Sequence, residues 1–123
     1  MAVTLSTAAR NLLCDAFVDS LDGGKIKLRA TNASGTVLAE LTFGTPAFGA
    51  AATGVATANA ITPDTSANAS GTAVAATIHK SDDTQMLDCS VSTSGADINL
   101  DNNVISATQE VGLDSLTVTV PAS

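Results

Sequence analysis

Apolar residues recur every three or four positions near the start of the chain. Between residues 6 and 24 they share one helix face: Ala9, Leu12, Leu13, Ala16, Phe17 and Leu21. Ser6 is a suitable N-cap, and Gly23-Gly24 can supply the left-handed residue that ends many helices. The pattern predicts an amphipathic helix that covers an open face or end of a sheet. We expect four residues to make that packing: Leu12, Leu13, Phe17 and Leu21. Docking of the helix on another subunit is the alternative.

The period of the pattern changes from 3.6 to 2 after Gly24. Ile26, Leu28 and Ala30 alternate with three basic residues, and a turn at residues 32–35 leads to a second alternating run that ends at Phe43. We therefore predict a β-hairpin over residues 25–43. The basic residues form a stripe on one strand face that would suit an acidic partner surface, with a solvated face as the alternative: Lys25, Lys27 and Arg29.

Six further stretches have the composition of short strands. They cover residues 53–61, 72–79, 86–91, 97–100, 104–107 and 111–120, and turn-forming residues separate most of them. Short strands at this spacing after one helix favour a mainly β fold, an antiparallel β-sandwich or jelly roll with an N-terminal amphipathic helix. A chain of 123 residues fits one domain, with the helix in residues 1–24 and the sandwich in residues 25–123.

The stretch from Gly44 to Gly71 consists largely of Ala, Gly, Thr, Asn and Ser, and Asp64 is its one ionisable residue. Small uncharged side chains let two surfaces approach closely. We therefore predict a contact with another subunit or a partner protein here, with Phe43 and Phe48 as its large apolar anchors. An internal strand with two ordinary loops is equally compatible with the sequence.

Charge and composition narrow the range of partners. Five Lys and Arg against twelve Asp and Glu give a net charge of −7, which disfavours nucleic acid and anionic membranes as direct partners. The sequence has no apolar run long enough for a membrane span, and its first residues lack the features of a signal peptide. We expect the protein to stay in the cytoplasm in which it is made.

Few residues suggest chemistry. Cys14 and Cys89 lie 75 positions apart without a CxxC pattern, so we expect both to be reduced and buried. His79 is the single histidine, and no nucleophile motif accompanies it. These observations predict a protein that is not an enzyme and needs no cofactor.

Residues 97–103 place oxygen-bearing side chains at alternate positions, as the start of a calcium loop does. The sixth position is Asn102 rather than Gly, and the twelfth is Thr108 rather than Glu. We therefore expect a solvated strand and turn here, without a metal.

Several motifs occur in a distinctive order along most of the chain. They are Ala8-Ala9-Arg10-Asn11 and Leu21-Asp22-Gly23-Gly24, then residues 46–51 (PAFGAA) and 54–61 (GVATANAI), then residues 94–100 (SGADINL) and 116–121 (LTVTVP). This order resembles small head-module structural proteins of tailed bacteriophages. The resemblance implies a cement or decoration protein that binds the major capsid protein and is found in the virion, after synthesis in the bacterial cytoplasm.

The resemblance implies no catalytic residue, and it leaves the position in the particle open. A neck, tail or fibre-base component is the first alternative. A carbohydrate-binding module is the second, and the lack of Trp and Tyr weighs against it. A closed homo-oligomer, either a dimer or a trimer, is expected in each structural case.

Overall fold

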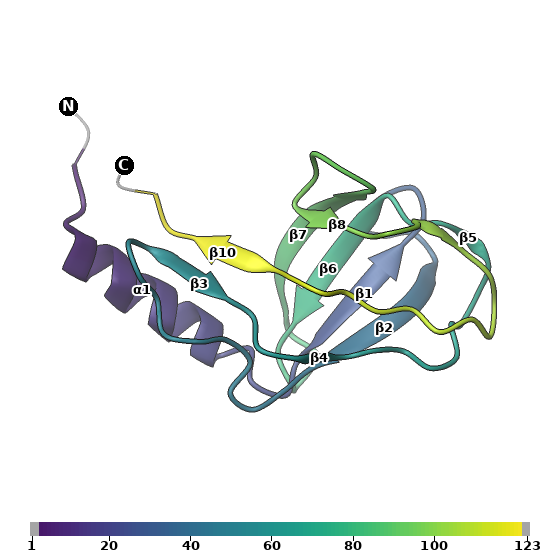
Figure 1. Cartoon of the computed structure of the whole chain (residues 1–123), viewed down its shortest axis with the longest axis horizontal. Helices are drawn as coiled ribbons and strands as arrows, with labels where there is room; N and C mark the ends of the chain where they lie inside the picture. Colours follow the sequence, from purple (N-terminus) through teal and green to yellow (C-terminus); the bar gives the residue numbers. More distant parts are fainter. Residues whose placement is uncertain (1–2, 122–123) are drawn as a thin grey trace.

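The computed structural model describes residues 3–121 and is mainly β, with one N-terminal helix (Figure 1). Its largest element is a curled six-stranded sheet. In spatial order the strands are β4 (Ile61–Thr62), β2 (Val37–Phe43), β1 (Lys25–Arg29), β6 (Ala75–His79), β7 (Gln85–Ser92) and β8 (Ile98–Asn99). All neighbours are antiparallel except β7 and β8, which are parallel. The predicted mainly β fold with an N-terminal helix is therefore confirmed, whereas an all-antiparallel pairing is not.

The predicted hairpin is present in β1 and β2. Lys27 pairs with Glu40 and Ile26 with Leu41, and one register shift follows Leu28. Because side chains alternate across a strand, Ile26 and Leu28 face the core and are fully buried.

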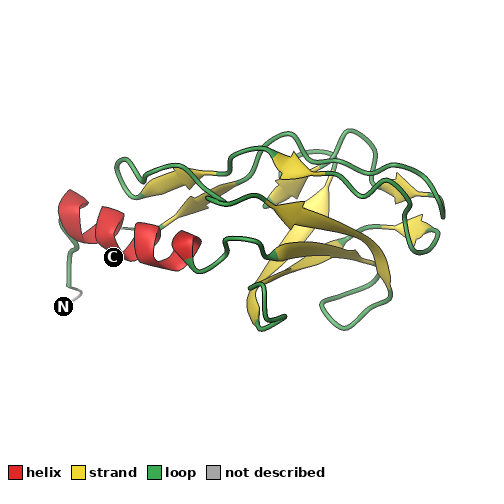
Figure 2. Cartoon of the chain, turned by 90° about the horizontal axis from the view of Figure 1, so that it is seen from below, coloured by secondary structure: helices red, strands yellow, loops and turns green. Residues whose placement is uncertain are grey.

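β6 lies in the centre of the sheet, between β1 and β7, and all five of its residues are buried. Such a strand must be covered on both faces, which explains the small side chains Ala75, Ala76 and Thr77. A second layer gives the molecule its sandwich-like form. It contains the two-stranded sheet of β5 (Gly71–Thr72) and β9 (Val104–Ile105) and buried residues of the segment that follows, Val111 and Leu113 (Figure 2).

Helix α1 covers Thr7–Asp19. Ser6 is its N-cap, as predicted, because the Ala9 backbone N–H donates a 3.2 Å hydrogen bond to the Ser6 hydroxyl. The helix ends five residues earlier than predicted. Residues 20–23 form a turn that leaves through Gly23 at φ +71°, a conformation that favours glycine.

α1 does not cover the six-stranded sheet. It packs against the small sheet of β3 (Val55–Thr57) and β10 (Thr117–Thr119), and these three elements project from the end of the β body (Figures 1 and 2). We call this unit the arm. Both strands are shorter than the sequence pattern predicted, since residues 53–61 also contain part of β4 and residues 111–120 are mostly loop.

Phe43 and Phe48 lie in the core, with 2% and 4% of their surface exposed, and their ring centroids are 5.4 Å apart. The prediction that they anchor a contact with another subunit is therefore wrong. The stretch from Gly44 to Gly71 is internal strand and connecting loop, the alternative that the sequence left open. Phe48 of this stretch packs against Phe43 of β2 instead.

Candidate functional site

Three polar residues of α1 bind backbone groups of the arm. Arg10 Nε donates to the Val120 carbonyl at 2.9 Å, and the Asn11 side-chain oxygen accepts from the Gly54 N–H at 2.8 Å. Asp15 accepts from the Ala51 N–H at 2.7 Å. Buried backbone groups need such partners, because the loop around residues 50–54 has few strand hydrogen bonds of its own. These three polar contacts join the helix to separate backbone segments of the arm.

Gly54 allows this arrangement. Its φ is +77°, and a Cβ at this position would come within 2.7 Å of Arg10 Nε and of the Val120 carbonyl oxygen. A side chain here would meet both partners of the hydrogen bond that joins the start of the helix to β10.

The outer face of α1 is consequently apolar. Leu12 is 71% exposed and Leu13 50% exposed, although the sequence pattern predicted that both pack on the sheet. Phe17 is half-buried and Leu21 fully buried, as predicted, while Cys14 and Val18 form the rest of the inner apolar contact.

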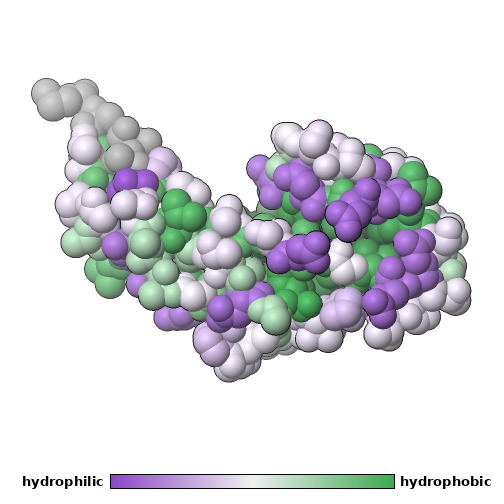
Figure 3. Space-filling model, in the orientation of Figure 1, coloured by the Kyte–Doolittle hydropathy of each residue, from purple (hydrophilic) through white to green (hydrophobic). Residues whose placement is uncertain are grey.

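We use the term outer helix face for five apolar residues on the outward side of α1, four of them exposed and Ala9 half-buried: Ala8, Ala9, Leu12, Leu13 and Ala16. None of these five is charged, in a chain of net charge −7, and the exposed Asp19 follows them in the last turn. Apolar surface is visible along the outer margin of the arm over α1 in the space-filling view (Figure 3). A surface helix normally exposes mostly polar side chains, whereas α1 also exposes two leucines.

The basic stripe of the first strand is largely used within the chain. Lys27 forms an ion pair with Asp83 at 2.8 Å and lies 3.9 Å from Glu40. Arg29 donates to Thr77 Oγ1 and to the Gly35 carbonyl, both at 3.0 Å. Lys25 is exposed and has no ion pair within residues 3–121. The stripe is thus part of the internal polar network and offers one free cation to a partner.

His79 belongs to the same network. It is 5% exposed; its Nε2 lies 2.8 Å from Thr77 Oγ1, and its Nδ1 lies 3.1 Å from the Asp83 carbonyl. Both ring nitrogens therefore have partners in the chain, as expected for a structural histidine.

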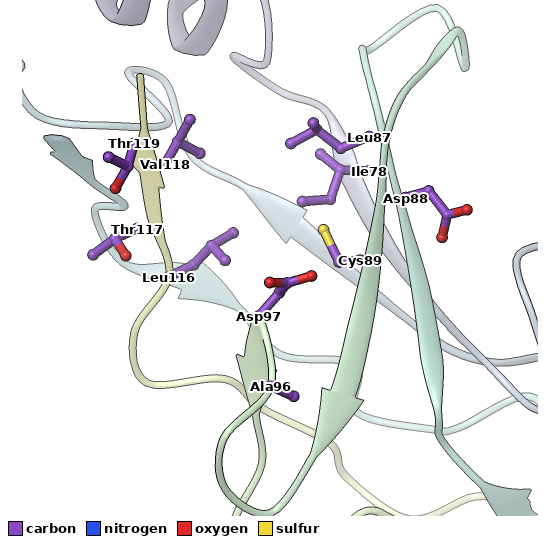
Figure 4. A pocket seen from close by; sticks show the side chains of 10 residues that line it. All are labelled: Ile78, Leu87, Asp88, Cys89, Ala96, Asp97, Leu116, Thr117, Val118 and Thr119. Carbon is purple, nitrogen blue, oxygen red and sulfur yellow. The ribbon is translucent and has the colours of Figure 1, made fainter. Parts of the chain in front are cut away.

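An open groove of about 480 Å³ lies between the arm and the six-stranded sheet (Figure 4). Leu116 and Val118 of the arm point toward apolar side chains of the sheet, whereas Thr117 and Thr119 point away. The sheet contributes Ile78, Leu87 and Cys89 to the groove. Asp88 and Asp97 also line the groove, so its walls combine apolar side chains with carboxylates.

Cys89 is the one nucleophilic side chain among the residues lining this groove. Burial, with a smaller contribution from the carboxylates of Asp97 and Asp88, raises the pKa of its thiol to about 11. Burial also raises the pKa of the fully buried Cys14. The reactive form of a cysteine is the thiolate, so Cys89 is protonated and weakly nucleophilic at neutral pH. Both cysteines are free, as predicted, but Cys89 is half-buried rather than fully buried.

The oxygen-bearing side chains of residues 97–103 form local hydrogen bonds. Asp97 accepts from the Ser90 N–H, Asn99 from the Ala96 N–H and Asn102 from the Val104 N–H. Across residues 3–121, no group of three or more His, Cys, Asp and Glu side chains is placed to hold a metal ion. The segment is a short strand followed by a turn, the structure that its departures from the calcium-loop pattern suggested.

The comparisons with known proteins are negative: no family model, no curated protein and no solved structure matches the chain. In the part of the chain that the structure describes, no helix has the length and apolar character to cross a membrane. The function therefore has to be argued from the surfaces of the molecule.

Proposed function

We propose that the protein is a structural subunit of a bacteriophage virion, a cement or decoration protein that binds the major capsid protein and stabilises its lattice. The observation that carries the proposal is the outer helix face. A projecting helix that uses Arg10, Asn11 and Asp15 for internal contacts and exposes two leucines favours a protein that works in contact with others.

The arm gives this surface a suitable position. It extends from the end of the β body, so a partner can reach the outer helix face without disturbing the main sheet (Figures 1 and 3). One helix face buries too little area for tight binding on its own, but many copies on one particle would add their weak contacts.

Charge supports a protein partner. A net charge of −7 would repel the packaged genome, and Lys25 is the remaining free cation of the basic stripe in the described residues. We propose that the protein forms a homo-oligomer and joins the shell from outside, without touching nucleic acid or a membrane. The sequence motifs that resemble phage head-module proteins favour the same function.

Purified particles provide the test. Quantitative mass spectrometry should detect the chain at hundreds of copies per particle, and a reconstruction should place its density on the capsid surface. A few to a dozen copies would favour the neck, tail or fibre-base alternative. The absence of the chain from washed particles would contradict a role in the virion.

A binding assay links the function to the arm. Particles that lack the protein should recover it from solution, and the Leu12→Asp variant should be retained at least about tenfold more weakly, because a carboxylate would be buried without a partner in whichever contact of the outer helix face holds the chain on the particle. Val104→Asp is the matched control, since Val104 is also exposed (55%) but lies in β9, outside the arm. Equal binding by both variants would remove the outer helix face from the proposal.

A further inference from the structure

We infer that the outer helix face pairs with the same face of a second copy, so that two α1 helices lie antiparallel across a two-fold axis. This inference rests on the proposed assembly function, and it names the partner of the surface that the proposal uses. Four features of α1 support it: the distribution of large and small side chains, the size of the face, the charges at the helix ends and the contacts that hold the arm rigid.

The outer helix face is complementary to itself. Its two large residues, Leu12 and Leu13, lie in the middle, and alanines flank them on both sides. A two-fold axis between Leu12 and Leu13 places residue 9 opposite residue 16 of the second copy. The leucines of each helix then enter the space above the alanines of the other, which allows interaxial distances near the short end of the usual 8–10 Å.

The size of the face suits a weak contact between copies. α1 has 13 residues and is therefore about 20 Å long. A pair of such helices buries less than the roughly 800 Å² per partner of a standard stable interface. We accordingly expect a dimer in the micromolar range, which exchanges in solution and becomes firm where a lattice raises the local concentration.

The charges of α1 select the antiparallel arrangement. Its first turn has no acidic residue and its last turn no basic residue, so the helix has no charged side chain of its own that compensates either end of its dipole. Asp19 is exposed in the last turn, beside the negative end of its own helix. The axis described above places Asp19 opposite Ser6 of the second copy, at the positive end of that helix. A parallel pair would instead bring the two Asp19 carboxylates together.

The inner contacts of α1 keep the outer face in one conformation. Arg10, Asn11 and Asp15 fix the helix to three different backbone segments of the arm. A helix fixed in this way loses little further conformational freedom on pairing, which favours association.

Sedimentation velocity on the full-length protein, from about 1 μM to about 1 mM, tests the inference. The wild-type protein should pass from monomer to dimer over this range. Leu12→Asp should remain folded by circular dichroism and weaken dimerisation at least about tenfold, whereas Val104→Asp should dimerise like the wild type. A wild-type monomer at the highest concentration, or an unimpaired Leu12→Asp dimer, would overturn the inference.

Charge changes test the antiparallel arrangement with variants that do not endanger the fold. Ala8→Glu and Asp19→Lys each place a favourable charge at an end of their own helix, so each should raise the thermal midpoint of the monomer. Each should also weaken the dimer by about two- to fivefold, because the new charge meets a like charge or dipole end of the second copy. The double variant Ala8→Glu/Asp19→Lys should recover wild-type dimerisation. A double variant that is weaker than both single variants would exclude the antiparallel pair.

The two proposals can fail separately. A dimer that the Leu12→Asp change disrupts, together with absence of the chain from particles, would leave the pairing intact and remove the virion function. A strictly monomeric protein whose Leu12→Asp variant loses particle binding would show that the capsid, and not a second copy, covers the outer helix face.

Discussion

Thr77 Oγ1 lies 2.8 Å from Nε2 of His79, two residues further along the buried central strand. The Asp83 carbonyl oxygen can only accept, so Nδ1 of His79 carries the hydrogen that is donated to it. Nε2 of the neutral ring therefore accepts from the Thr77 hydroxyl, whose oxygen also accepts a hydrogen bond from Arg29 Nε. The hydroxyl thus connects Arg29 to the turn that follows β6.

Replacement of this hydroxyl should destabilise the fold. Thr77→Val keeps the shape of the side chain but leaves a buried ring nitrogen and a guanidinium N–H without their partner. We expect the free energy of unfolding, measured in urea, to fall by about 1–3 kcal/mol. Thr42→Val, at an exposed position of β2, should change it by less than about 0.5 kcal/mol. Nitrogen chemical shifts that show a protonated Nε2 in neutral His79 would contradict the assigned network.

The contrast between Phe48 and Leu12 provides a second stability test. Phe48 is buried against Phe43, so Phe48→Ala should lower the free energy of unfolding by about 3–5 kcal/mol. Leu12→Ala, at a position that is exposed in the monomer, should have little effect when measured below the dimerisation range. Similar losses of stability for the two variants would mean that Leu12 is buried in the monomer and that the other side of the helix is exposed.

The two free cysteines should differ in how they react with iodoacetamide. Cys89 is accessible in the folded protein, but a pKa of about 11 in place of 9.0 lowers its thiolate fraction at pH 8 about a hundredfold, and its rate should fall accordingly. Cys14 should react only when the protein unfolds, because its side chain is fully buried. Asp97→Asn should increase the rate at which Cys89 reacts, because the Asp97 carboxylate raises the pKa of the thiol. A slower reaction in that variant would contradict the position of Asp97 beside Cys89 in the groove.

The same thiol predicts a pH dependence of stability. The folded protein keeps the Cys89 proton, whereas the unfolded chain releases it above about pH 9, so stability should decline between about pH 9 and pH 11. Cys89→Ser should remove this part of the decline. An unchanged alkaline profile in that variant would assign the decline to other groups.

Asp83 should affect stability in the acid range. A hydrogen bond from Lys27 lowers the pKa of its carboxyl below 3.8, so the ion pair contributes above that pH and is lost as the pH falls through the lowered pKa. The difference between wild type and Asp83→Asn should therefore be present at pH 6 and shrink as the pH falls below 3.8 and through the lowered pKa. It should be small, because Asp83 is exposed and salt screens the pair. Asp101→Asn, at an exposed position, is the control, and a difference that persists at low pH would not come from this ion pair.

Local patterns predicted much of the fold. The hairpin, the helix N-cap at Ser6 and the left-handed Gly23 all depend on residues close in sequence, and each is present. The pairing of β3 with β10 joins segments that are about 60 residues apart, and the parallel contact of β7 and β8 has no local signature. Contacts of that range depend on how the whole chain folds, so no short window of sequence contains them.

The prediction that Leu12 and Leu13 pack on the sheet was wrong for a specific physical reason. The apolar residues of α1 are distributed almost all round it: Cys14 and Val18 on the inner side, Leu12 and Leu13 on the outer side. Periodicity finds such a helix but does not decide which side is covered. The decision came from Arg10, Asn11 and Asp15, whose distant backbone partners cannot be identified from the sequence.

The hydrogen bond between Arg10 and Val120 joins residues that are 110 positions apart. It can therefore form only late in the synthesis of the chain. The six-stranded sheet does not include this contact, so it can fold first. The arm can be completed only when the segment through Val120 has left the ribosome. The outer helix face therefore takes its final form last, on a molecule whose sheet already exists. A nascent or prematurely terminated chain would lack the surface for pairing, so copies that join an assembly would have been selected for being complete through β10.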